Sequence, residues 1–175
     1  MISPPERRLI LVRHAKSAYP SGVPDRDRPL AGRGRRNALA CGRWLRSDGP
    51  KVQLALYSDA VRAAQTWEII SGALSAAPPA RKVPGIYTAT GPDDLLAIVA
   101  EVPARVRALV LVGHEPVLSA TTLRLAGAKS ELDARRQAAS KYRTNGVAVL
   151  RFSAAGWADL VPGRGVLESF TVPRA

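Results

Sequence analysis

Two short apolar runs in this chain each end at a histidine. Residues 9–12 (Leu-Ile-Leu-Val) lead into an Arg-His pair at His14, and residues 108–112 (Ala-Leu-Val-Leu-Val) lead through a glycine to His114. Each run is uninterruptedly apolar and too short for a helix, which predicts a buried strand of a parallel sheet. Because open α/β folds bind their ligands at the carboxyl ends of their strands, we expect both imidazoles at one edge of one sheet. The chain contains no other histidine.

Helix-like and strand-like segments alternate along most of the sequence. Helical spacing of apolar residues is found in residues 30–46, 60–74, 92–101 and 116–125, and strand-like composition in residues 52–57, 82–87, 147–152, 156–160 and 168–172. Either Ser58 or Asp59 could cap the second helix. Residues 129–143 fit a helix or a loop, whereas residues 18–29 are rich in proline and charge and are expected to form a loop. The alternation predicts a three-layer α/β/α sandwich with a mainly parallel central sheet, and the length predicts a single domain over residues 1–175.

Composition excludes several classes of protein. With 46% hydrophobic and 23% charged residues, the chain is too apolar to be disordered. No apolar run approaches the roughly 20 residues of a membrane span, and residues 1–6 do not look like a secretory signal, so we expect a cytoplasmic protein with no membrane partner. Cys41 is the only cysteine, which excludes an internal disulfide and a cysteine-based metal site. The apolar residues around it predict that Cys41 is a small buried residue of the core.

The net charge of +12 invites a nucleic-acid interpretation without requiring it. The basic residues are spread along the chain, and neither a zinc finger nor an RNA-binding aromatic motif accompanies them. We therefore interpret the charge mainly as attraction for anionic substrates and expect no nucleic-acid partner.

Arg13, His14, Arg62 and His114 form a set that suits phosphoryl chemistry. Three of them stand at predicted strand ends, and Arg62 falls in the first turn of the helix over residues 60–74. Two guanidiniums and an imidazolium bind a tetrahedral dianion well, because arginine offers planar forks that match phosphate oxygens. The remaining imidazole could then attack phosphorus, and such a clamp needs no metal ion. An arginine is electrostatically misplaced at a helix N-terminus, which itself points to function.

These residues resemble the motifs of the histidine phosphatase superfamily. Residues 11–17 (Leu-Val-Arg-His-Ala-Lys-Ser) are similar to its Arg-His-Gly/Ala signature, and the Ala-Lys-Ser ending resembles the short SixA-like phosphohistidine phosphatases. Residues 27–34, 57–66 and 112–116 resemble three further motifs of that branch in order and spacing. The resemblance extends from about residue 9 to residue 126 and implies a phosphoglycerate mutase-like fold.

The resemblance also implies a role for each residue of the set. His14 would be the nucleophile that forms a phosphohistidine, while Arg13, Arg62 and His114 would hold the phosphoryl oxygens, and Ser17 would add a hydroxyl group. Water would then hydrolyse the intermediate. No metal or organic cofactor is implied, and the expected partner is a phosphorylated substrate, foremost a protein that bears phosphohistidine.

The proton donor is the part that the sequence determines least. Glu115 follows the second histidine, where many SixA-like sequences have Asn, although a helix starting at Pro116 would aim it away. The branch commonly has Glu-Leu-Tyr where this chain has residues 85–87, Gly-Ile-Tyr, so an acid is missing there. Asp25 and Asp27 are alternatives. If no acid serves, good leaving groups such as the imidazole of phosphohistidine are favoured.

Two other functions are compatible with these residues. The same mechanism could act on small phosphate esters or nucleotides. The chain could also be a phosphate-binding or RNA-binding module that has lost turnover, which the missing acid at Gly85 favours. Phosphotransfer of the mutase kind is disfavoured, because no long insertion is available to enclose a substrate.

Overall fold

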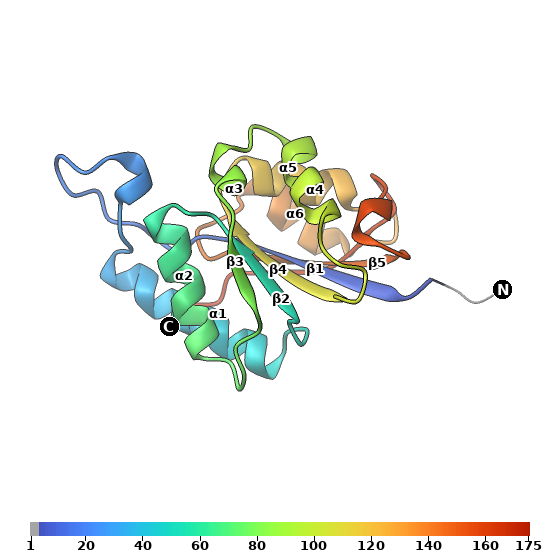
Figure 1. Ribbon diagram of the computed structural model, residues 1–175, viewed down its shortest axis with the longest axis horizontal. Helices are drawn as coiled ribbons and strands as arrows, with labels where there is room; N and C mark the ends of the chain where they lie inside the picture. The colour runs from blue at the N-terminus through green and yellow to red at the C-terminus, as the bar shows by residue number, and fades with distance from the viewer. Residues whose placement is uncertain (1–3) are drawn as a thin grey trace.

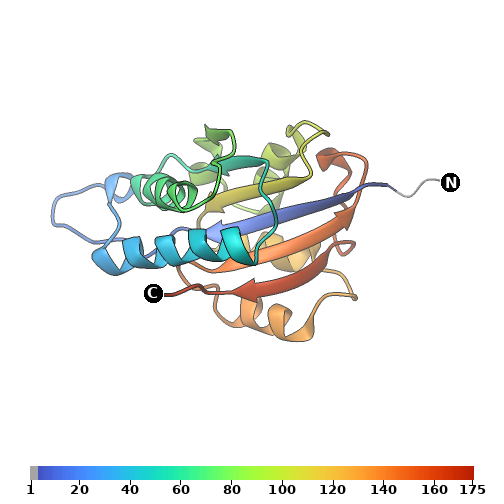
Figure 2. The ribbon, with the colours of Figure 1, turned by 90° about the horizontal axis from the view of Figure 1, so that it is seen from below.

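The computed structural model describes residues 4–175, and in them six strands form one sheet with helices on both faces (Figures 1 and 2). The strands are β1 (Glu6–Arg13), β2 (Leu54–Tyr57), β3 (Ala80–Lys82), β4 (Ala108–Gly113), β5 (Val147–Ser153) and β6 (Val166–Thr171). Their order across the sheet is β3-β2-β4-β1-β5-β6. The first four strands in this order are parallel, whereas β5 is antiparallel to both of its neighbours. The prediction of a mainly parallel sheet is confirmed.

The helices lie in two layers, one on each face of the sheet (Figure 1). They are α1 (Gly32–Ser47), α2 (Val61–Gly72), α3 (Gly85–Thr88), α4 (Pro92–Ala100), α5 (Val117–Leu125) and α6 (Leu132–Ser140). Side chains along β1 alternate between the two faces. Leu9 and Leu11 belong to the core cluster that includes α4, α5 and α6, whereas Ile10 and Val12 pack in the cluster that includes α1 and α2. The predicted three-layer sandwich is therefore confirmed.

Two of the predicted strands are wrong in part or in full. The expected strand over residues 82–87 ends at Lys82, because Pro84 starts a turn that continues as α3. The single turn of α3 buries Ile86 against the α4 side of the core. Residues 156–160 form a 3-10 helix, Trp157–Asp159, instead of a strand. The buried Trp157 indole donates a hydrogen bond to the Val106 carbonyl. This segment therefore packs its tryptophan into the core and does not pair with a strand of the sheet.

Two further segments agree with the sequence. The ambiguous stretch 129–143 contains a helix, α6, and the proline-rich segment 18–29 is a loop with one 3-10 turn at Asp25–Asp27. Cys41 is fully buried, and burial raises the pKa of its thiol to about 12, as expected for a small core residue.

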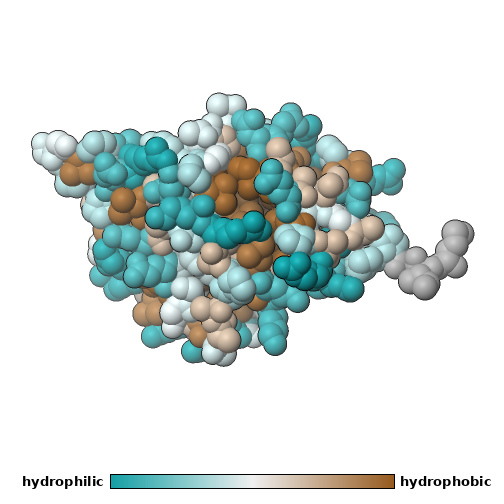
Figure 3. Space-filling view, in the orientation of Figure 1, coloured by the Kyte–Doolittle hydropathy of each residue, from teal (hydrophilic) through white to brown (hydrophobic). Residues whose placement is uncertain are grey.

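The exterior is largely polar. On the face seen in Figure 3, hydrophilic side chains surround a smaller apolar region near the centre. Within residues 4–175, the exposed large apolar side chains are Tyr19, Leu39, Leu132 and Val161. None of the helices in this part of the chain has the length and apolarity that crossing a membrane requires.

Candidate active site

Parallel pairing of β1 with β4 brings the two histidines together. Arg13 is in register with Gly113, and the His14 backbone N–H donates to the Gly113 carbonyl over 3.0 Å. His14 and His114 therefore follow adjacent strand ends, and their ring centroids lie 5.1 Å apart. The expectation that both imidazoles share one sheet edge is met.

Arg62, in the first turn of α2, connects the two imidazoles. Its side chain is 7% exposed, and its Nε donates to Nε2 of His14 over 3.3 Å. One terminal nitrogen, Nη2, lies 3.4 Å from Nδ1 of His114. The guanidinium also donates to the backbone carbonyl and to the carboxylate of Asp25, over 2.6 Å and 3.0 Å. A buried cation thus faces the same space as both rings.

The hydrogen bonds of His14 define which of its nitrogens is basic. Nδ1 lies 2.8 Å from the carbonyl oxygen of Ala15, and since a carbonyl only accepts, Nδ1 carries the proton. Nε2 consequently has the free lone pair, to which Arg62 donates. Burial is the main reason that the pKa of His14 falls to about 3, and the neighbouring His114, Arg62 and Arg13 lower it further. The ring is neutral at pH 7.

His114 is oriented by Ser58. Because the Arg62 guanidinium can only donate to Nδ1, the proton of the neutral ring is on Nε2, which lies 2.7 Å from the Oγ of Ser58. Ser58 is fully buried and also accepts the Ala60 backbone N–H over 3.2 Å. Burial, followed by the charge of Arg62, lowers the pKa of His114 to about 4.

The predicted caps of α2 are not used as expected. The N-cap of α2 is Ala60, and no side chain caps this helix end. The Ser58 hydroxyl is instead hydrogen-bonded to the His114 imidazole, which follows the end of β4. Asp59 forms an ion pair with Arg26 of the proline-rich loop. That ion pair ties the loop to the start of α2, beside the histidines.

A cavity of about 220 Å³ encloses these groups. Its walls include all six residues singled out from the sequence, together with Lys16, Tyr19, Arg28 and Thr144; the six are Arg13, His14, Ser17, Arg62, His114 and Glu115. Arg13 is held by a bond from Nη1 to the Tyr142 carbonyl over 2.7 Å. Its Nε is buried with no hydrogen-bond partner within residues 4–175. Ser17 is buried, and its hydroxyl accepts a bond from Arg28 over 2.8 Å.

The three candidate acids are placed very differently. Asp25 accepts hydrogen bonds from Arg28, Tyr87 and Arg62, of which the bond from Arg28 does most to lower its pKa, to about 2. It is therefore a carboxylate at neutral pH and cannot donate a proton. Asp27 is exposed and does not line the cavity.

Glu115 lines the cavity and is half-buried. Its Oε1 accepts the backbone N–H of Ser119 over 2.9 Å, in the first turn of α5. The helix start after Pro116 therefore holds one carboxylate oxygen, as the sequence suggests, but the side chain still reaches the cavity wall.

Three residues that support the site were given no role in it from the sequence: Ser58, Thr66 and Asn145. The Thr66 hydroxyl accepts the backbone N–H of Ala15 over 3.0 Å and donates to the Arg62 carbonyl over 2.6 Å, which ties α2 to the segment after β1. Asn145 is fully buried, and its backbone N–H lies 3.1 Å and 3.2 Å from the carbonyl oxygens of Arg13 and His14. Its positive φ of 65° fits the Asn-Gly dipeptide that marks turns, so this signal was available in the sequence.

The site is a small cavity lined by cationic side chains and by the neutral imidazole of His14. Arg62 donates to the Nε2 lone pair of His14 and Arg13 lines the same cavity, which suits binding of a tetrahedral anion in reach of a nucleophile. Within residues 4–175, no three His, Cys, Asp or Glu side chains are grouped as metal ligands.

Comparisons with known proteins identify the family and the fold. Residues 9–86 match the histidine phosphatase superfamily (branch 1). An uncharacterized protein of Mycobacterium tuberculosis (strain H37Rv) is 42% identical over 164 residues, which cover 93% of this chain and 100% of that protein. The structure of a candidate phosphohistidine phosphatase SixA from Nakamurella multipartitia has a TM-score of 0.85 at 34% identity and covers 99% of this chain and 100% of its own. Phosphoglycerate mutase from Plasmodium falciparum shares the fold, with a TM-score of 0.63 at 20% identity over 97% of this chain and 93% of its own.

Proposed function

Because this chain belongs to the SixA-like branch of the histidine phosphatase superfamily and has a phosphoglycerate mutase-like fold, we propose that it is a metal-independent phosphatase in which His14 carries the phosphoryl group. One observation carries this proposal. The Nε2 lone pair of a neutral, buried imidazole faces a cavity whose other walls bear Arg13, Arg62 and His114. The nucleophilic nitrogen and the side chains that would bind the phosphoryl oxygens therefore line one small cavity.

The reaction proceeds in two displacements at phosphorus. In the first, Nε2 of His14 attacks the phosphorus atom, the bond to the leaving group breaks, and the leaving group departs with the electron pair. In the second, the oxygen of a water molecule attacks phosphorus, the P–N bond breaks, and its electrons return to Nε2. The water supplies the fourth oxygen of orthophosphate, and its proton leaves with the product or to solvent.

The cationic side chains stabilise the charge that these displacements spread over the three equatorial oxygens. Arg13 and Arg62 donate N–H groups to those oxygens. His114 is neutral in the free protein, but a bound phosphate dianion favours its protonated form, and it then becomes a third cationic donor. Ser17 adds a hydroxyl at the cavity wall.

The preferred leaving group depends on whether Asp25 or Glu115 can protonate it. Asp25 is ionised, so Glu115 is the proposed proton donor for leaving groups that need one. One oxygen of the Glu115 carboxylate is already bound to the Ser119 backbone N–H. This arrangement favours substrates whose leaving group needs little protonation, such as the imidazole of a phosphohistidine. We propose a phosphohistidine-bearing protein as the first substrate class. Small phosphate esters are the second substrate class.

The proposal is tested with p-nitrophenyl phosphate and the variant His14→Ala. Wild-type protein should hydrolyse this ester at an unchanged rate after treatment with a chelator, and His14→Ala should reduce the rate to background. A phosphohistidine protein, a set of nucleotides and small phosphate esters, assayed side by side, rank the substrate classes. Activity that survives in His14→Ala, or that the chelator abolishes, contradicts the proposal. Tight phosphate binding without turnover would instead identify a phosphate-binding module.

A further inference from the structure

A second and larger hollow adjoins the catalytic cavity. Its volume is about 550 Å³, and Arg13, Lys16 and Thr144 line both spaces, so the two are direct neighbours. Its other walls come from α1, from the loop after α6 and from the C-terminal segment, which runs beside α1 (Figure 2). The wall residues are Arg13, Lys16, Arg33, Arg36, Asn37, Lys141, Arg143, Thr144, Arg174 and Ala175. Seven of these ten are arginine or lysine, and none is aspartate or glutamate.

These positive charges are not neutralised within the described chain. None of the ion pairs in residues 4–175 includes a cationic side chain of this hollow. Elsewhere in the protein some arginines are paired with carboxylates, as Arg151 is with Glu168 and Arg28 with Asp25. Like charges that share a concave surface repel one another, and a bound anion removes that repulsion.

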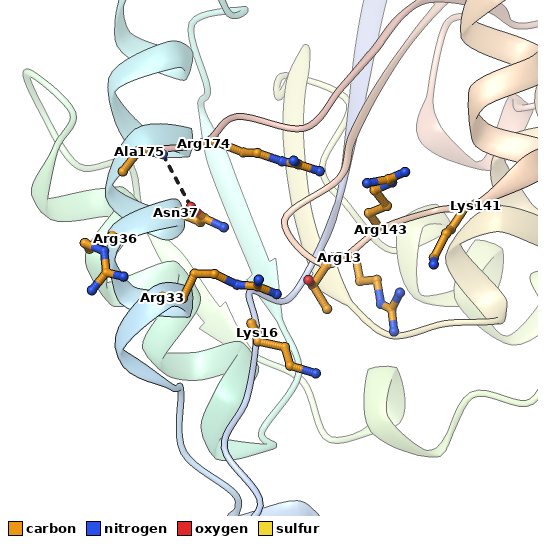
Figure 4. A pocket seen from close by; sticks show the side chains of 10 residues that line it. Arg13, Lys16, Arg33, Arg36, Asn37, Lys141, Arg143, Arg174 and Ala175 are labelled. Atoms are coloured by element: carbon orange, nitrogen blue, oxygen red, sulfur yellow. Dashed lines mark hydrogen bonds between the residues drawn. The ribbon is translucent and has the colours of Figure 1, made fainter.

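The side chains converge on a shared space. Figure 4 shows Arg33 and Arg174 extending from the α1 side toward the space that Arg143 and Lys141 line from the opposite side. Arg36 lies on the outer side of α1 and points away. Guanidinium forks that converge from separate segments match the oxygens of a phosphate group better than a flat basic surface does.

We infer that this hollow is a second phosphate-binding subsite, which takes the second phosphate group of a substrate that carries two. The inference rests on the proposed function, because it places the transferred phosphoryl group at His14 and the other phosphate beyond Arg13. The volume lies within the range of small-molecule sites, so this subsite suits a bisphosphorylated member of the second substrate class, the small phosphate esters.

The test compares orthophosphate, pyrophosphate and inorganic triphosphate as inhibitors of p-nitrophenyl phosphate hydrolysis. Triphosphate has further phosphate groups that can lie beyond Arg13 when one of them occupies the catalytic cavity, whereas orthophosphate has none. In wild-type protein, triphosphate should inhibit at least about tenfold more strongly than orthophosphate, as one or two additional charge-assisted hydrogen bonds allow. The variants Arg143→Gln and Arg174→Gln should reduce this ratio severalfold.

Arg46→Gln is the matched control, since Arg46 is an exposed arginine at the far end of α1. It should leave the ratio at its wild-type value. Equal inhibition by the three anions in wild-type protein, or an equal change in Arg46→Gln and Arg143→Gln, overturns the inference. Dependence of phosphoprotein hydrolysis on Arg143 and Arg174, with no change in triphosphate inhibition, also overturns it, because the surface would then dock a protein.

Failure of the proposed function is recognised separately. If wild-type protein does not hydrolyse p-nitrophenyl phosphate, or His14→Ala does so equally well, the catalytic proposal fails. Titration calorimetry with orthophosphate and triphosphate then makes the same comparison on the same three variants. A preference for triphosphate that Arg143→Gln reduces would still support the subsite, and the absence of that preference would overturn it.

Discussion

Arg62 donates a hydrogen bond from its Nε to Nε2 of His14, over 3.3 Å. A guanidinium has no lone pair to offer, so this contact identifies Nε2 as the basic nitrogen of the ring. The opposite nitrogen is occupied by the Ala15 carbonyl. The tautomer needed for attack through Nε2 is therefore set before any substrate binds. An incoming phosphate only has to replace Nε2 as the acceptor of the Arg62 hydrogen bond.

Replacing Ser58 with alanine removes the hydroxyl that orients His114. We expect kcat for p-nitrophenyl phosphate to fall about tenfold, because the His114 ring loses the hydrogen bond that fixes its Nε2. The pH dependence of kcat should also change, because Nε2 of His114 loses the hydroxyl oxygen that accepts its hydrogen bond. Ser71→Ala, at the other end of α2, is the control and should behave as wild type. An unchanged rate and pH profile in Ser58→Ala would show that Ser58 has no part in the site.

The buried His14 and the partly buried His114 make the fold sensitive to acid. The pKa values of His14 and His114 fall from 6.5 to about 3 and about 4. Between these values and 6.5, the unfolded chain binds more protons than the folded one, so the free energy of unfolding decreases as the pH falls from about 6.5 to 4. The loss should be of the order of a few kcal/mol.

Urea denaturation at a series of pH values measures this loss. The variant His14→Asn has one titrating group fewer and should show a shallower slope in this window. Asp25, with its pKa lowered from 3.8 to about 2, affects stability only at lower pH, because its contribution is present above 3.8 and is lost below it. Equal slopes for His14→Asn and wild type would contradict the neutral, buried state of His14.

Glu115→Gln tests the proton donor. If Glu115 protonates the leaving group, this variant should lose more activity on phenyl phosphate than on p-nitrophenyl phosphate, because the phenolate is the poorer leaving group. Asp25→Asn should affect the two esters equally, since its carboxylate is ionised and held by Arg28 and Arg62. Plots of kcat/KM against leaving-group pKa for the three proteins provide the measurement. Parallel plots for Glu115→Gln and wild type would exclude Glu115 as the acid.

Asn145 links the catalytic segment to α1 and the C-terminal segment. Its Nδ2 donates to the carbonyl oxygens of Asn37 and Pro173, over 2.9 Å and 2.7 Å. Asn145→Ala should cost about 2–3 kcal/mol of stability, from two lost hydrogen bonds and a strained left-handed backbone. Asn145→Gly, which tolerates that backbone, should cost about 1 kcal/mol less. Equal losses for both variants in urea denaturation would contradict the contribution of strain.

The sequence could predict the parts of the site that depend on local pattern. The apolar runs before His14 and His114 are long enough to identify buried strands, and parallel strands bring their carboxyl ends to one edge. The helical spacing after residue 60 placed Arg62 in a first turn. These inferences needed only periodicity and the general geometry of parallel sheets.

Contacts between distant segments were beyond the reach of such patterns. Ser58 looks like a helix cap until β4 brings His114, 56 residues later, within 2.7 Å of it. Residues 83–87 resemble a strand because Val, Ile and Tyr favour strands, but the core beside α4 takes up Ile86 as a helical turn. The cationic hollow likewise combines α1 with two segments more than a hundred residues away, so spread-out arginines gave no local signal.

Trapping the intermediate tests the central claim most directly. Wild-type protein should be mixed with p-nitrophenyl phosphate, quenched within milliseconds by alkaline denaturation, which preserves phosphohistidine, and analysed by intact-mass and peptide mass spectrometry. The account predicts a mass increase of one PO₃ group on the peptide that contains His14, formed in wild-type protein and absent in His14→Ala. Hydrolysis that continues while this peptide stays unmodified at every quench time, or a phosphoryl group found on His114 instead, would contradict it.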